Sequence, residues 1–174
     1  FRRNEGLLPA QIRQNLQKIA ADFAAIPVCR TEKVKVGIVG EIYVKYSPFG
    51  NNNLEEFLFS EGCEYMVPGV LSFLRFLFYN KETDYLYYGG SQAKKNFSVV
   101  AGGVIRKLEK IMLEVLRDYP QFTPPATFSE LCDISTHILD RGVKMGEGWL
   151  LPAEMGELIE KGYHNIVCAQ PFGC

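Results

Sequence analysis

The 174 residues of this chain suffice to bury one hydrophobic core, and the composition, 47% hydrophobic and 22% charged, is that of a globular protein. A net charge of −1 argues against the broad basic face that nucleic-acid binding needs. The most apolar run, 67–79, is interrupted by Pro68, Gly69, Ser72 and Arg75, so it predicts a buried helix and no membrane span.

The five cysteines, Cys29, Cys63, Cys132, Cys168 and Cys174, are an odd number and include no CxxC pair. This pattern indicates neither a disulfide framework nor a zinc ribbon. Reduced thiols and a cytoplasmic location are therefore expected. Cys29, Cys63 and Cys132 are interpreted as structural, and Cys168 is expected to fill a buried strand.

The beginning of the chain predicts a helix and then a central strand. Apolar side chains recur at helical spacing over 9–25, and Pro27 stops that helix. A β-branched run over 33–43 predicts a strand buried on both faces. Residues 1–32 are accordingly expected to form an N-terminal helix and linker.

The segment that follows the strand predicts a β–α–β unit. Residues 47–53 are rich in turn formers, and Asn52 or Asn53 is expected to cap a helix over 54–62. A second short strand is expected over 63–67. Because a helix separates the two strands, we expect them to be parallel.

A helical insertion is predicted over about 70–125. Apolar residues at helical spacing over 100–115 require a packing partner, and Gly102 and Gly103 mark a bend or a close helix contact. The aromatic residues of 85–88 are interpreted as core, with a contact surface for a partner as the alternative.

The end of the chain repeats the α–β pattern. Thr127 and Glu130 form a capping-box sequence before a helix closed by Gly142, and a shorter helix over 151–161 precedes a strand over 166–169. The expected fold is α/β, with a small parallel Rossmann-like three-layer sheet of three to four strands over 33–174 and an all-helical insertion. This lobe is expected to be a fragment of a larger protein.

Cys174 is the first candidate for chemistry. The strand over 166–169 leads into Gln-Pro-Phe-Gly and then this thiol, and ligands collect beyond the carboxyl ends of parallel strands. Thiolates are the usual ligands of iron–sulfur clusters. The alternative is a free surface thiol.

Two loops supply the other candidates. The loop 41–53 contains Ser47 and the three asparagines Asn51, Asn52 and Asn53; it is either a ligand or interface loop or a structural one. It carries no glycine-rich nucleotide fingerprint. Glu147 lies between two glycines and close to Trp149. Two interpretations are open for it: a contact with a ligand or partner, or an exposed turn residue. His137 and His164 lack a partner at catalytic spacing. They are interpreted as histidines that are hydrogen-bonded within the protein or exposed to solvent.

Three segments, 36–56, 146–155 and 165–174, together resemble the 2-hydroxyacyl-CoA dehydratase activator (CoA enzyme activase) family. The resemblance is to the dehydratase-like region of these multidomain anaerobic proteins. It implies that Cys174 corresponds to the cysteine of a Gln-Pro-Phe-Gly-Cys motif and is a metal ligand. It also implies an iron–sulfur cluster in the full-length protein, and ATP use only through actin-type ATPase domains that this chain lacks.

The predicted function is an accessory redox module of an ATP-dependent activator of 2-hydroxyacyl-CoA dehydratase. Its expected partners are the actin-type ATPase domains, in the same or a partner chain, and a dehydratase-type protein, with no nucleic acid and no membrane. Ser47, Asn51–Asn53 and Glu147 are expected to line the cofactor cleft or interface. The chain alone is expected to have no catalytic activity and to be isolated without a cluster. The alternatives are a non-redox binding module for a CoA thioester or nucleotide, and a docking scaffold.

Overall fold

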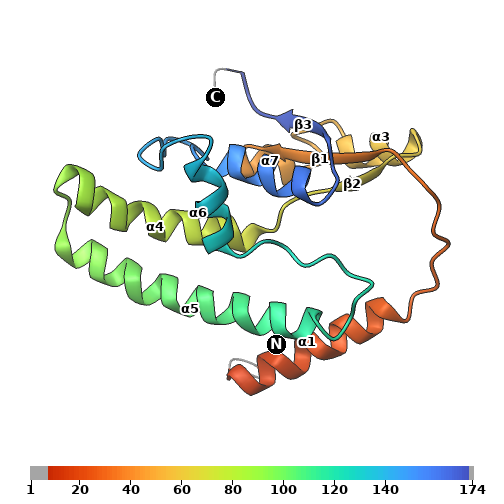
Figure 1. Cartoon of the computed structure of the whole chain (residues 1–174), viewed down its shortest axis with the longest axis horizontal. Coiled ribbons are helices and arrows are strands. Elements are labelled where there is room, and N and C mark those ends of the chain that lie inside the picture. The colour runs from red at the N-terminus through yellow and green to blue at the C-terminus, as the bar shows by residue number, and fades with distance from the viewer. Residues whose placement is uncertain (1–7, 173–174) are drawn as a thin grey trace.

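The computed structural model describes residues 8–172 and is shown in Figure 1. The helices are α1 (Pro9–Ala24), α2 (Ile42–Tyr46), α3 (Leu54–Ser60), α4 (Val70–Tyr88), α5 (Gln92–Leu116), α6 (Phe128–Thr136) and α7 (Leu150–Glu160). The strands are β1 (Lys35–Gly40), β2 (Glu64–Met66) and β3 (Asn165–Ala169). Each helix is too short or too polar to cross a bilayer, within the part of the chain that is described.

The three strands form one parallel sheet in the order β2-β1-β3. The predicted α/β class and the small parallel sheet are therefore confirmed. β1 occupies the centre because its side chains alternate between two buried faces. Val36 and Ile38 pack with Leu58 of α3, whereas Val39 packs with Leu158 of α7.

Gly37 allows α7 to lie close to the sheet. A Cβ atom at this position would lie 2.7 Å from Leu158 Cδ1 and 2.8 Å from Ile166 Cδ1. The glycine in the middle of β1 is therefore explained by close helix–strand packing.

The segment predicted as a helical insertion contains α4 and α5, which lie side by side as a long hairpin in Figure 1. Helix α1 packs along the far half of α5, where Arg13 pairs with Glu114. Two roles were predicted for Gly102, a bend or a close helix contact, and the structure shows the contact. Because Gly102 has no side chain, the Arg75 side chain of α4 packs directly against its backbone.

An aromatic core joins this hairpin to the end of the chain. Trp149 is fully buried, and its ring centroid lies 5.4 Å from that of Phe76 in α4 and 5.7 Å from that of Phe128 in α6. Leu131 and Ala153 complete the same cluster. The insertion thus shares its core with α6 and α7.

Two predicted boundaries are wrong. The strand expected over 33–43 ends at Gly40, and Ile42–Tyr46 form α2 instead. Gly40 has φ +141°, which leaves the strand conformation, and the Glu41 side chain then caps α2. The helix expected to reach Gly142 ends at Thr136, because the amides of Ile138 and Leu139 both bond to Ser135 O in a tighter turn.

Cys168 is exposed, which contradicts its prediction as core filler. Within the described part of the chain, β3 lies at the edge of the sheet and pairs with β1 alone. A strand in a parallel sheet is buried on both faces only where helices cover both of its faces, and Cys168 lies near the end of an edge strand.

Candidate functional site at the carboxyl edge of the sheet

β1 and β3 end side by side at the same edge of the sheet. Gly40 is in register with Ala169, and the Glu41 amide donates a hydrogen bond to Ala169 O at 3.0 Å. The chain first turns from β1 to β2 on one side, and β3 later joins on the other side, so the strand order reverses between β1 and β3. In open α/β sheets ligands bind in the crevice at this switch point.

Gly40 allows the two strand ends to come this close. A Cβ atom here would overlap Ala169 O and lie 2.6 Å from Ala169 C, both of which are backbone atoms that cannot swing away. The glycine thus satisfies a steric need as well as its positive φ.

Two carboxylates hold the beginning of α2 at this edge. Glu41 accepts a hydrogen bond from the Val44 amide at 2.9 Å, and Glu147 accepts one from the Ile42 amide at 2.8 Å. Glu147 is only 5% exposed, so the alternative prediction, that it is an exposed turn residue, is wrong. The amide donors at the start of α2 are therefore engaged by the protein's own acids.

A buried ion pair fixes α2 to α7. Lys45 Nζ lies 2.7 Å from Glu154 Oε2, and the two side chains are 2% and 1% exposed. Burial raises the pKa of Glu154 and Lys45 lowers it, while Glu157 and Glu147 raise it further. Glu154 Oε1 is buried and has no hydrogen-bond partner, which leaves Lys45 as the group that compensates the buried charge.

Tyr46 makes a further attachment. Its hydroxyl donates a hydrogen bond to Pro68 O, between β2 and α4. Burial, followed by the charges of Glu154 and Glu55, raises the pKa of Tyr46 to about 12. Helix α2 is thus held to α7, to the 146–149 turn and to the β2–α4 connection.

The asparagine-rich loop is built by local hydrogen bonds. Asn51 donates to Val44 O at 3.0 Å and accepts from the Leu54 amide at 3.1 Å, so it caps α3. Asn53 holds the N-cap position, as one of the two predicted residues, but its side chain makes no capping hydrogen bond, and both Asn52 and Asn53 adopt φ +55°. Asparagine tolerates this left-handed conformation better than most residues.

Ser47 also has a local partner, since its Oγ accepts a hydrogen bond from the Gly50 amide at 3.2 Å. Asn51 and Asn53 line a cavity of about 330 Å³ together with Glu55, Glu56 and Tyr65. Ser47, Asn51 and Glu147 thus stabilise the backbone, and the assignment of Ser47, Asn51, Asn52, Asn53 and Glu147 to a ligand stays a prediction.

Cys174, the predicted metal ligand, lies outside the described residues. Within 8–172, His, Cys, Asp and Glu side chains form no group of three or more that is arranged to hold a metal ion. Cys132 is buried, and burial raises the pKa of its thiol, which keeps it in the less reactive form. His137 and His164 are exposed.

Sequence reasoning missed the Lys45–Glu154 pair and the capping role of Glu147. Each involves partners more than 100 residues apart, and no spacing rule connects them. The available signal was a pair of glutamates, Glu154 and Glu157, on the face of α7 that also buries Leu150, Ala153 and Leu158.

Comparison of the chain with family models, curated proteins and solved structures found no match.

Proposed function

We propose that this chain is a Rossmann-like lobe, with helix layers on both faces of the sheet, from a cytoplasmic ATP-dependent activator of 2-hydroxyacyl-CoA dehydratase. In this proposal the lobe is an accessory redox module that helps host an iron–sulfur cluster. The actin-type ATPase domains and the dehydratase-type protein are its partners.

The observation that supports this function is the meeting of β1 and β3 at the switch point. Residues 170–172 leave β3 at this edge and are exposed, beside the Glu41 turn. Cys174 follows two residues further along the chain. A thiol near the carboxyl ends of parallel strands lies where open α/β proteins place their ligands.

The acidic groups at this edge weigh against the competing function, in which the edge binds a nucleotide or CoA thioester. Glu41 and Glu147 already accept hydrogen bonds from the first amides of α2. Those amides are the groups that would otherwise receive a phosphate. A redox role for the edge does not need free amides at the start of α2.

The cluster in this proposal takes its other ligands from other parts of the full-length protein or from a partner, since one cysteine cannot hold a cluster. The chain's own contribution is a rigid support. The Gly40 contact, the Glu147 cap and the Lys45–Glu154 pair fix α2 and the end of β3 relative to each other.

Cys174→Ala in the full-length protein is expected to reduce bound iron and acid-labile sulfide and to weaken the visible absorbance after anaerobic reconstitution. The physical reason is the loss of one thiolate ligand. Cys29→Ala is the matched control, because Cys29 is exposed in the segment between α1 and β1. Equal iron content and equal spectra for Cys174→Ala and the unmodified protein would remove the role assigned to Cys174.

A docking scaffold is the second candidate function, and one observation favours it. Leu86, Tyr87 and Tyr88 at the end of α4 are 67%, 56% and 67% exposed, although aromatic residues there were expected to be core. They lie near the turn of the α4–α5 hairpin, at the end remote from the sheet in Figure 1. Exposed tyrosines are common anchors in protein interfaces.

If this hairpin docks the ATPase domains, the double substitution Tyr87→Ser with Tyr88→Ser is expected to weaken their association by about tenfold or more. Tyr43→Ser is the control, because Tyr43 is 62% exposed and belongs to α2. Titration of labelled ATPase domains with each variant measures the change. Equal affinities for all three proteins would remove the docking role without affecting the assignment of Cys174.

A further inference from the structure

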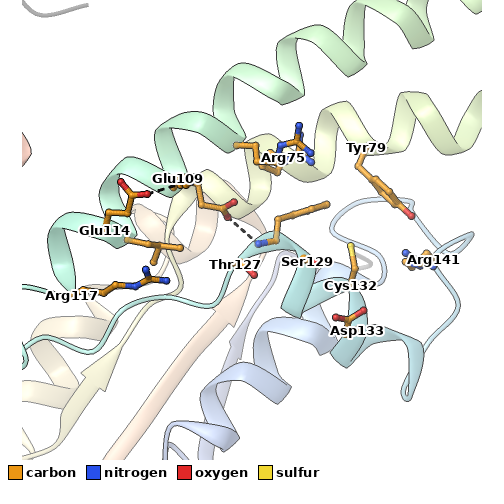
Figure 2. Close-up of a pocket in the computed structure, with 14 residues that line it drawn as sticks. Arg75, Tyr79, Glu109, Glu114, Arg117, Thr127, Ser129, Cys132, Asp133 and Arg141 are labelled. Carbon is orange, nitrogen blue, oxygen red and sulfur yellow. Dashed lines mark hydrogen bonds and ion pairs between the residues drawn. The ribbon is translucent and has the colours of Figure 1, made fainter. Parts of the chain in front are cut away.

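A cavity of about 540 Å³ lies between α4, α5, α6 and the loop after α6, and Figure 2 shows the side chains around it. Five basic residues line it: Arg75, Arg106, Lys110, Arg117 and Arg141. Three acidic residues also line it, namely Glu109, Glu114 and Asp133. The basic residues come from α4, from α5 and its end, and from the loop, so positive charge surrounds the cavity on several sides.

Two of the three carboxylates are engaged by the protein itself. Glu109 is buried and accepts a hydrogen bond from the Phe128 amide at 2.9 Å, at the start of α6. Glu114 pairs with Arg13 of α1, and the hydrogen bond from this arginine is the main reason that the pKa of Glu114 is lowered. Arg13 is not among the lining residues, but Glu114 also lies 3.9 Å from Lys110, which is one. Of the five cavity cations, only Lys110 forms an ion pair with a lining carboxylate among the described residues.

Arg75 is held in place by apolar and backbone surfaces. Its guanidinium carbon lies 5.1 Å from the centre of the Phe128 ring, and its head group packs on the bare backbone of Gly102. Its Nε is buried and has no hydrogen-bond partner. A buried donor without an acceptor is costly, and a bound anion would satisfy it.

Arg141 approaches the cavity from the loop after α6, as Figure 2 shows. Its guanidinium carbon lies 5.9 Å from the centre of the Tyr79 ring. Arg106, Lys110 and Arg117 are exposed and belong to α5 and its C-terminal cap. Two arginines therefore rest on aromatic rings, while Arg106 and Arg117 are exposed at the solvent side and Lys110 is paired with Glu114.

We propose that this cavity binds a small molecule that carries at least two phosphate groups. Arginine forks bind phosphate oxygens through paired charge-assisted hydrogen bonds, and several forks suit adjacent phosphates. The volume falls within the range of about 300–1,000 Å³ that is typical of small-ligand sites. The site uses no residue of the carboxyl edge, so it is independent of the redox proposal.

Isothermal titration of the chain with inorganic pyrophosphate and with ADP tests the proposal. Binding is expected to weaken by about tenfold or more in Arg141→Gln and in Arg75→Gln, since each removes a charge-assisted contact. Arg30→Gln is the matched control, because Arg30 carries the same charge but is exposed and lines a different cavity. It is expected to leave affinity unchanged.

A pair of glycine variants tests the position of Arg75 without changing any charge. In Gly102→Ala the new Cβ overlaps the Arg75 head group, which must move, whereas in Gly103→Ala the Cβ meets no atom within 4 Å. Both variants gain helix propensity, so both are expected to remain folded. Gly102→Ala is expected to weaken pyrophosphate binding several-fold, and Gly103→Ala is expected to leave it unchanged.

The two probes distinguish the source of the phosphates. Tighter binding of ADP supports a nucleoside ligand, and equal affinities support recognition of the phosphates alone. Absence of heat for both probes at millimolar concentration overturns the proposal. Equal weakening by Arg30→Gln and Arg141→Gln overturns it as well, because that result means non-specific attraction to positive charge.

Discussion

Lys45→Met is expected to lower the free energy of unfolding by about 3–5 kcal/mol, the usual cost of removing one partner from a buried ion pair. Glu154 is 1% exposed on its side chain, and its second oxygen already has no hydrogen-bond partner. Without Lys45 the carboxylate stays buried with no compensating charge. Urea unfolding of the variant and the unmodified chain measures the difference.

A double variant separates loss of charge compensation from loss of packing. Lys45→Met combined with Glu154→Leu replaces the pair by apolar groups, and it is expected to recover most of the lost stability. If the double variant is as unstable as Lys45→Met alone, the ion pair is not the cause of the destabilisation.

The same variant carries a pH signature. In Lys45→Met, burial and the charges of Glu157 and Glu147 still raise the pKa of Glu154, and the group that lowered it is gone. A raised folded-state pKa means that the folded chain binds the proton more tightly, so stability is present at low pH and is lost as the pH rises. The stability difference from the unmodified chain is therefore expected to shrink as the pH falls and Glu154 of the variant takes up a proton. A constant difference contradicts this account.

Gly40→Ala is expected to lower the free energy of unfolding by about 3 kcal/mol or more. The new Cβ would overlap the backbone oxygen of Ala169 and lie 2.8 Å from its nitrogen, and φ is +141° at this position. Because neither strand end has a flexible side chain that moves aside, β1 and β3 must separate at the carboxyl edge. Thermal and urea unfolding measure the loss.

Gly62→Ala is the matched control for this substitution. Gly62 also has a positive φ, of +75°, but a Cβ there meets no atom within 4 Å. It is expected to cost about 1 kcal/mol from backbone strain alone. Equal costs at Gly40 and Gly62 would falsify the steric role of Gly40, and would leave only its backbone conformation as the explanation.

Local signals in the sequence predicted most of the secondary structure. Apolar spacing identified α1, and the capping box before α6 is formed as predicted, with the Glu130 amide donating to Thr127 Oγ1 at 3.2 Å and the Thr127 amide donating to Glu130 Oε2 at 2.7 Å. The parallel sheet followed from short β-branched strands separated by helices. These features depend on residues close together in the chain, so a sequence pattern contains them.

Helix α2 shows where local reasoning failed. Ile42–Tyr46 has the apolar and aromatic composition of a strand, yet it is helical. Its first amide is held by Glu147, which lies 105 residues away, and its lysine is neutralised by Glu154, which lies 109 residues away. Loss of a buried ion pair or of a buried hydrogen bond costs more free energy than the small differences in secondary-structure propensity among residues.

The sequence by itself determined the α/β class, the helical character of the segment after β2 and the glycines at the turns, because spacing, caps and backbone freedom act within a few residues. Only the tertiary structure decided that Lys45 is buried, that Glu147 holds α2, and that arginines from separate elements surround one cavity. Electrostatic and steric partners are chosen by distance in space. No periodicity in the chain encodes which distant side chains will meet once the helices pack.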